Sequence, residues 1–154
     1  MYAIWNLTKV CPWDCSFCCM SAIKVNQVNR GKSLNFSEKI RILEILAAHK
    51  MKIDFSGGDP LYNPEDFAIV ERATEIMSKD YIDVSMTGVD FSERKLALLK
   101  KIGKVEISID NIPKDHNRFR PKGFNLSAIN ILKTLVEKKY FLFSCNYVIS
   151  AISR

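Results

Sequence analysis

Residues 52–88 read KIDFSGGDPLYNPEDFAIVERATEIMSKDYIDVSMTG, and this stretch decides the fold class. Its two ends, residues 52–56 and 82–87, are short apolar segments that are typical of buried strands and are each followed by glycine. Between them, residues 65–79 predict a helix with one apolar face, which is made of Ile69, Val70, Ala73, Ile76 and Met77. A strand, a helix and a second strand in this order indicate a parallel sheet with a right-handed crossover.

The same alternation extends outward in both directions along the chain. Residues 2–8 are apolar and aromatic, and we expect them to form a buried first strand. Helical spacing begins near Phe36, with Ser37 as a candidate cap. Further elements are expected as helices at 91–102 and 125–139 and as strands at 104–110 and 140–149. We therefore predict one α/β domain over residues 1–154, with about five parallel strands and alternating helices.

Composition narrows the class of protein further. The chain has 154 residues, of which 47% are hydrophobic and 26% charged, as in ordinary globular proteins. Its apolar runs are too short to span a bilayer, and residues 1–10 do not resemble a secretory signal, so a cytoplasmic location is expected. The net charge is +6, but the lysines are scattered and no aromatic residues interleave with them, so a nucleic-acid partner is not favoured.

Four of the five cysteines lie within residues 11–19, which is unlike a secreted disulfide framework and favours metal binding. Cys11, Cys15 and Cys18 follow the spacing C-x3-C-x2-C, so one short loop could hold three corners of an iron–sulfur cube. The fourth iron would then be open to bind a substrate. Cys19 is expected to point away from its neighbour Cys18.

A structural zinc site is the main alternative for these cysteines. Zinc would need a fourth ligand, and His49 and His116 are the candidates. Neither histidine lies at a zinc-finger spacing from the cysteines, so zinc is less favoured than the iron–sulfur interpretation.

Other chemical residues follow the predicted strands at the same edge of the sheet. The segment Gly57–Pro60 ends the second strand, Thr87 ends the third, and Asp110 ends the fourth. In parallel α/β folds, sites gather at this carboxyl edge. The Gly-Gly-Asp-Pro segment allows close backbone approach to a ligand and offers a carboxylate to an ammonium group, although a plain turn is an alternative.

The cysteine loop, with Phe17 before its last cysteine, resembles the signature of the radical S-adenosylmethionine (radical SAM) family. The resemblance implies a partial (β/α) barrel and a [4Fe–4S] cluster bound by Cys11, Cys15 and Cys18. It also implies that SAM chelates the open iron and is cleaved to a 5′-deoxyadenosyl radical that abstracts hydrogen from a substrate. A peptide or a small molecule, in natural-product or cofactor maturation, is the implied substrate, and flavodoxin or ferredoxin the implied electron donor.

The same resemblance assigns roles to further residues. Gly57, Gly58, Asp59 and Pro60 resemble the family's GGEP motif, which binds the amino group of SAM, with Asp59 in place of Glu. Thr87 lies in a segment similar to T-N-G that lacks the Asn. The remaining implied cofactor contacts are Ser108 to the carboxylate or ribose of SAM, Asp110 toward the substrate, Arg120 to a carboxylate, and Asn146 and Ile149 near the adenine. Simple strand alternation at Ser108 and Asp110 and a surface location of Arg120 are the alternatives.

The family's usual core continues to a sixth strand, so this resemblance implies an incomplete C-terminal end. We expect either a piece of a longer protein or a barrel completed by another chain or protomer. A non-catalytic metal- or SAM-binding α/β domain, degenerate or incomplete, is the alternative function.

Overall fold

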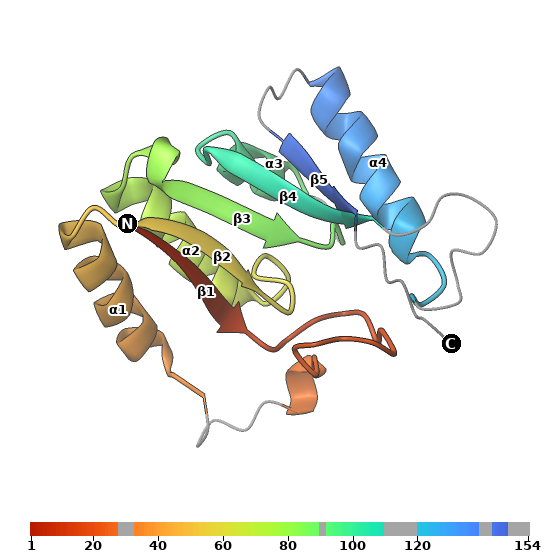
Figure 1. Cartoon of the computed structure of the whole chain (residues 1–154), viewed down its shortest axis with the longest axis horizontal. Helices are drawn as coiled ribbons and strands as arrows, with labels where there is room; N and C mark the ends of the chain where they lie inside the picture. The colour runs from red at the N-terminus through yellow and green to blue at the C-terminus, as the bar shows by residue number, and fades with distance from the viewer. Residues whose placement is uncertain (28–32, 90–91, 110–119, 139–142, 148–154) are drawn as a thin grey trace.

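The computed structural model describes residues 1–27, 33–89, 92–109, 120–138 and 143–147. It contains one five-stranded sheet, made of β1 (Tyr2–Thr8), β2 (Lys52–Gly57), β3 (Ile82–Met86), β4 (Lys104–Ile109) and β5 (Phe143–Tyr147). Every neighbouring pair is parallel, and the strand order follows the chain from β1 to β5. The predicted parallel α/β fold of the partial-barrel type is confirmed, and the arrowheads of all five strands point to one edge of the sheet (Figure 1).

The connections between strands are helical, as expected. The helices are α1 (Phe36–Ala48), α2 (Pro64–Ile76), α3 (Glu93–Leu99) and α4 (Phe124–Glu137), with short 3-10 turns at Val25–Gln27 and Lys79–Tyr81. Helix α1 packs against α2, and helix α4 packs against β4 (Figure 1). Helix α3 is shorter than predicted and ends at Leu99. The Ser92 side chain caps its start by accepting a hydrogen bond from the Lys95 N–H.

The predicted cap of α1 was wrong by two residues. The side chain of Asn35, not of Ser37, accepts a hydrogen bond from the Glu38 N–H at 3.0 Å. The Glu38 carboxylate in turn accepts from the Asn35 N–H at 2.8 Å. This reciprocal capping box satisfies two backbone donors at once, which a serine two residues later could not do.

The sheet has one apolar and one polar face. Ile53, Phe55, Val84 and Ile107 point to the helices and are fully buried. The opposite face carries a ladder of polar side chains, which consists of Tyr2, Lys52, Asp54, Asp83, Ser85, Lys104 and Glu106. Strand alternation explains this division, because successive side chains point to opposite faces.

Strand β1 is an edge strand, which corrects the expectation that it is buried. Its outward side chains Tyr2 and Ile4 are 55% and 63% exposed, whereas Leu7 is buried in the core and Trp5 packs partly against it. The strand reads as apolar because one face packs against helices, while its other face lies on the open side of the sheet.

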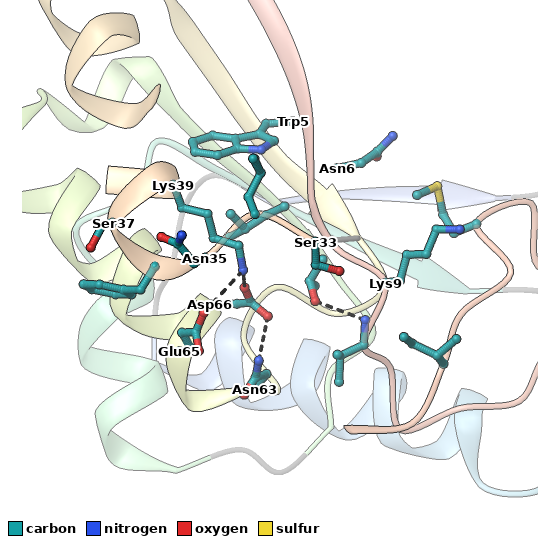
Figure 2. A pocket seen from close by; sticks show the side chains of 17 residues that line it. Trp5, Asn6, Lys9, Ser33, Asn35, Ser37, Lys39, Asn63, Glu65 and Asp66 are labelled. Carbon is teal, nitrogen blue, oxygen red and sulfur yellow. Dashed lines mark hydrogen bonds and ion pairs between the residues drawn. The ribbon is translucent and has the colours of Figure 1, made fainter. Parts of the chain in front are cut away.

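A buried ion pair joins the first two helices. The Lys39 ammonium of α1 lies 2.5 Å from the Asp66 carboxylate of α2, and both residues are at least 90% buried. Asn63 donates a second hydrogen bond to Asp66 at 2.9 Å. These residues form one wall of a pocket of about 840 Å³ between α1, α2 and β1 (Figure 2).

In the part of the chain that the structure describes, we find no helix that is both long and apolar enough to cross a membrane.

Candidate functional site

The cysteine loop leaves β1 at the carboxyl edge of the sheet and is closed at its stem. Val10 and Ile23 form an isolated parallel bridge, in which the Cys11 N–H donates to the Ile23 carbonyl at 3.0 Å. The Ile23 N–H donates to the Lys9 carbonyl at 2.9 Å. Inside the loop, the Cys18 N–H donates to the Cys15 carbonyl at 3.1 Å. The three motif cysteines therefore lie in one short loop with fixed ends.

The segment after β2 is bonded directly to this stem. The Gly58 N–H donates to the Thr8 carbonyl at 2.7 Å, and the Asp59 N–H donates to the Val10 carbonyl at 2.8 Å. A Cβ atom at Gly57 would lie 2.2 Å from the Thr8 oxygen, and one at Gly58 would lie 2.2 Å from the Val10 oxygen. The two glycines are thus required because the backbone of the cysteine loop approaches them, a reason that the sequence alone did not reveal.

Asp59 and Thr87 are brought together by the fold. Asp59 is 2% exposed, and its Oδ2 accepts hydrogen bonds from the Thr87 N–H at 3.1 Å and from the Thr87 hydroxyl at 2.5 Å. Its Oδ1 accepts a bond from the Leu61 N–H at 2.9 Å. Pro60 is also buried. This carboxylate therefore joins the ends of β2 and β3 directly beneath the cysteine loop.

The cysteines differ in exposure. Cys11 is buried, Cys15 and Cys18 are half-buried, Cys19 is exposed, and all four are free thiols. Burial raises the pKa of the Cys11 thiol to about 11, with further raising by Asp59, Cys15 and Cys18 and an opposing backbone hydrogen bond at Trp13. Cys11 is therefore within electrostatic reach of both other motif thiols and of the Asp59 carboxylate.

The donor set fits an iron–sulfur cluster by its chemistry. Three thiols in one half-buried loop are the ligands that iron–sulfur clusters take. Among the described residues, however, no three His, Cys, Asp or Glu side chains are already grouped at metal-binding geometry. His49 is exposed at the C-terminal end of α1, which is the end of the helix away from the cysteine loop, so it does not supply a zinc ligand there. His116 lies outside the described residues.

Arg120 contacts the cysteine loop, a contact that sequence reasoning missed. Its Nη1 donates a hydrogen bond to the Cys15 sulfur at 3.4 Å. Its guanidinium carbon lies 4.7 Å from the ring centroid of Phe17 and 4.2 Å from that of Phe124. Trp13 packs edge-on against Phe124, with centroids 5.3 Å apart. No spacing rule could reveal this contact, because Arg120 and Cys15 are 105 positions apart.

The other candidates are only partly placed. Ser108 is half-buried on β4, between the buried Ile107 and Ile109, and pairs in register with Asn146 of β5. The predicted division of β4 into two faces is therefore confirmed for the described residues. Asp110 and Ile149 lie outside the described residues.

Comparisons with known proteins agree with this geometry. The family model of the Radical SAM superfamily matches residues 5–149. Molybdenum cofactor biosynthesis protein moc-5 of Caenorhabditis elegans is 29% identical over 113 residues, and molybdenum cofactor biosynthesis protein 1 of Dictyostelium discoideum is 31% identical over 113 residues. Each match covers 71% of this chain and 18% of the relative.

Solved structures show the same fold. Native anSMEcpe with bound AdoMet superposes with a TM-score of 0.66 at 17% identity, covering 94% of this chain and 42% of that one. Streptococcus suis SuiB superposes with a TM-score of 0.59 at 14% identity, covering 99% and 41%. The chain therefore spans less than half the length of these neighbours.

A parallel partial barrel with a three-thiol loop at its carboxyl edge defines a class of enzymes that use an iron–sulfur cluster. The chain belongs to the radical SAM superfamily, since the family model matches nearly all of it. A [4Fe–4S] cluster and SAM are the cofactors of this family, and reductive cleavage of SAM is its general reaction. Such enzymes need a reductant and a substrate.

Proposed function

We propose that this chain generates a 5′-deoxyadenosyl radical, with Cys11, Cys15 and Cys18 as the ligands of three irons of a [4Fe–4S] cluster. One observation carries the proposal. The C-x3-C-x2-C loop is hydrogen-bonded through Thr8 and Val10 to the Gly-Gly-Asp segment after β2, so both motifs share one edge of the sheet. The contact between the two motifs indicates a cluster and SAM site more specifically than either motif does alone.

Held by Cys11, Cys15 and Cys18, the cluster would supply the one-electron reduction that cleaves SAM to methionine and the 5′-deoxyadenosyl radical. Asp59 is held in place by hydrogen bonds from Thr87 and Leu61. In this proposal its carboxylate would also accept from the amino group of SAM. Gly57, Gly58 and Pro60 shape the backbone around that group.

The other roles follow the strands across the sheet. We assign Ser108 to the carboxylate or ribose of SAM, and Asn146 and Ile149 to its adenine. Asp110 faces the substrate in this proposal, and Phe17 packs beside the cluster. The family resemblance implies a carboxylate contact for Arg120, whose guanidinium donates to the Cys15 sulfur in the structure.

The substrate class is proposed from the relatives. The names of the curated relatives favour a small molecule in cofactor maturation over a peptide in natural-product maturation, and flavodoxin or ferredoxin would supply the electron. A cytoplasmic location is proposed because four free thiols within nine residues suit a reducing compartment. Since the match covers 18% of those relatives, we also propose that polypeptide beyond the described sheet contributes substrate contacts, from the same or another chain.

The decisive experiment is anaerobic reconstitution with iron and sulfide, followed by EPR of the reduced protein with and without SAM. We expect a [4Fe–4S]⁺ signal that changes when SAM is added, and 5′-deoxyadenosine among the products. A colourless protein, or a signal that SAM does not alter, would instead support a non-catalytic metal- or SAM-binding domain.

Cysteine variants give the matched control for the ligand assignment. Cys11→Ala, Cys15→Ala and Cys18→Ala should each lose the cluster, measured as iron and sulfide per chain. Cys19→Ala, one position away on an exposed side chain, should load as the parent protein does. Loss of the cluster in Cys19→Ala but not in Cys11→Ala would contradict the assignment.

A further inference from the structure

Arg120 lies between the cysteine loop and helix α4, and an aromatic ring from each of them packs against its guanidinium. Phe17 belongs to the loop, and Phe124 is the first residue of α4. Phe124 is completely buried and is itself fixed edge-on by Trp13 of the loop. The guanidinium therefore lies against two rings at 4.7 and 4.2 Å while one of its N–H groups reaches the Cys15 sulfur.

This arrangement suits a guanidinium in particular. Its planar cation stacks on aromatic faces, while its N–H groups lie in the plane of the guanidinium and can donate hydrogen bonds there. A lysine ammonium in the same place would keep the charge but not the planar stacking. Because Arg120 is only partly exposed, its charge is screened less by solvent than that of a surface arginine.

The electrostatic consequence concerns the electron that the cluster receives. Hydrogen bonds to cluster sulfurs, together with local charge, set the reduction potential of iron–sulfur proteins. The reduced cluster carries one more negative charge than the oxidised cluster. A positive group at a ligand sulfur therefore stabilises the reduced state more and raises the potential, and the buried Asp59 carboxylate near Cys11 acts in the opposite direction.

We propose that Arg120 is a positioning residue that raises the reduction potential of the cluster through its hydrogen bond to Cys15, and is not a ligand of the SAM carboxylate. The proposal rests on the proposed function, because it needs the cluster on Cys15. It concerns only the transfer of one electron from an external donor to the cluster, and no bond is made or broken in that step.

The test is a redox titration of reconstituted Arg120→Gln, followed by EPR in the absence of SAM. At the midpoint potential of the parent protein, we expect the ratio of reduced to oxidised cluster to fall about tenfold, which corresponds to a shift of about 59 mV for a one-electron couple. Arg120→Lys should shift less, because it keeps the charge. Equal midpoints for the parent protein and Arg120→Gln, or a shift that appears only with SAM present, would overturn the proposal.

Two further variants keep the test interpretable. Arg94→Gln is the matched control. Arg94, a residue of α3, also stacks on an aromatic ring, that of Phe67, at 4.8 Å. Its ion-pair partner, however, is Glu71. The midpoint of this variant should not change. Phe124→Leu removes one of the two rings that stack on Arg120 and leaves Arg120 and Cys15 unchanged. We therefore expect it to lower the midpoint potential by less than Arg120→Gln does. This variant still tests the proposal if Arg120→Gln does not take up the cluster. An unchanged midpoint in Phe124→Leu would contradict a role of the Phe17 and Phe124 rings in holding Arg120 against Cys15.

Failure of the two ideas can be told apart. If the parent protein takes up no iron, the proposed function fails. If the parent protein loads and responds to SAM but its midpoint does not depend on Arg120, only the present inference fails.

Discussion

At the scale of single residues, Gly58 decides whether the cysteine loop can dock on the sheet. Its missing side chain leaves room for the Val10 carbonyl, which accepts the Asp59 N–H. An alanine there would push the stem of the loop away from β2. Gly58→Ala would therefore impair cluster binding more than it destabilises the fold.

We expect Gly58→Ala to lower the free energy of unfolding by about 1–3 kcal/mol, as overpacking does, and to impair cluster loading. Gly103→Ala is the control, since its Cβ would lie 2.4 Å from the Lys79 carbonyl, a similar backbone clash at the other end of the sheet. In urea unfolding, the control should be destabilised about as much as Gly58→Ala. Its iron content after reconstitution should nevertheless equal that of the parent protein. Equal loading in both variants would contradict the docking role of Gly58.

The sequence predicted the roles of residues only where those residues form a contiguous motif. The cysteine spacing and the Gly-Gly-Asp segment are contiguous, so their presence at one edge followed from the order of strands. The Asp59–Thr87 contact and the Arg120–Cys15 contact join residues 28 and 105 positions apart. Such pairs depend on how the loops close over the edge, and no periodicity records that.

At the scale of elements, the first two helices are joined by the buried pair of Lys39 and Asp66. Removing one partner leaves the other charge buried without compensation, which typically costs about 3–5 kcal/mol. Lys39→Met should therefore lower the free energy of unfolding by about that amount in urea. The double variant Lys39→Met/Asp66→Leu should recover most of the loss, because it leaves no buried charge. A double variant as unstable as the single one would show that the pair is not independent of its surroundings.

The polar face of the sheet makes stability depend on pH through Asp54. Burial raises the pKa of this carboxyl above its ordinary range, Glu106 and Asp83 raise it further, and hydrogen bonds from Ser85 and Tyr2 oppose the rise. Lys52 and Lys104 lie on the same face and pair with Asp83 and Glu106. Because the folded state holds the proton more tightly, the ionised form costs stability as pH rises through the folded pKa.

Asp54→Asn should therefore raise the melting temperature at pH 7. This gain should fade as the pH falls below about 3.9, the ordinary pKa of the unfolded aspartate, because the carboxyl then becomes protonated in both states. Melting curves from pH 3 to pH 8 would test this, with the exposed Asp80→Asn as the control. A gain that is the same at every pH would mean that the effect is not due to ionisation.

Most element boundaries followed from hydrophobic periodicity. The first strand was predicted at residues 2–8 and forms there, and β2 and β3 each differ from the prediction by one residue at their carboxyl ends. The described residues of β4 and β5 lie within their predicted ranges. What the pattern could not tell is which strand lies at the edge. Alternation gives the face of a side chain but not the number of neighbouring strands, so β1 was expected to be buried when it is not.

At the scale of the whole molecule, all five strands are parallel, so their carboxyl ends lie on one edge and a ligand there would contact several elements at once. Binding to the folded state alone stabilises it by mass action. With SAM at 100 times its Kd, we expect the reconstituted protein to gain about 2.7 kcal/mol, seen as a rise in the anaerobic melting temperature. The cluster-free protein should gain far less, and an equal gain would contradict chelation of SAM by iron.

The bridge between Val10 and Ile23 has a kinetic consequence for iron loading. Because both ends of the cysteine loop are fixed, the other two motif thiols stay close once one of the three has bound a metal. Tethering on this length scale gives effective concentrations of about millimolar or higher, without any new contact. The second and third thiolates should then bind almost at once, and partly ligated clusters should be short-lived compared with either the empty or the filled loop.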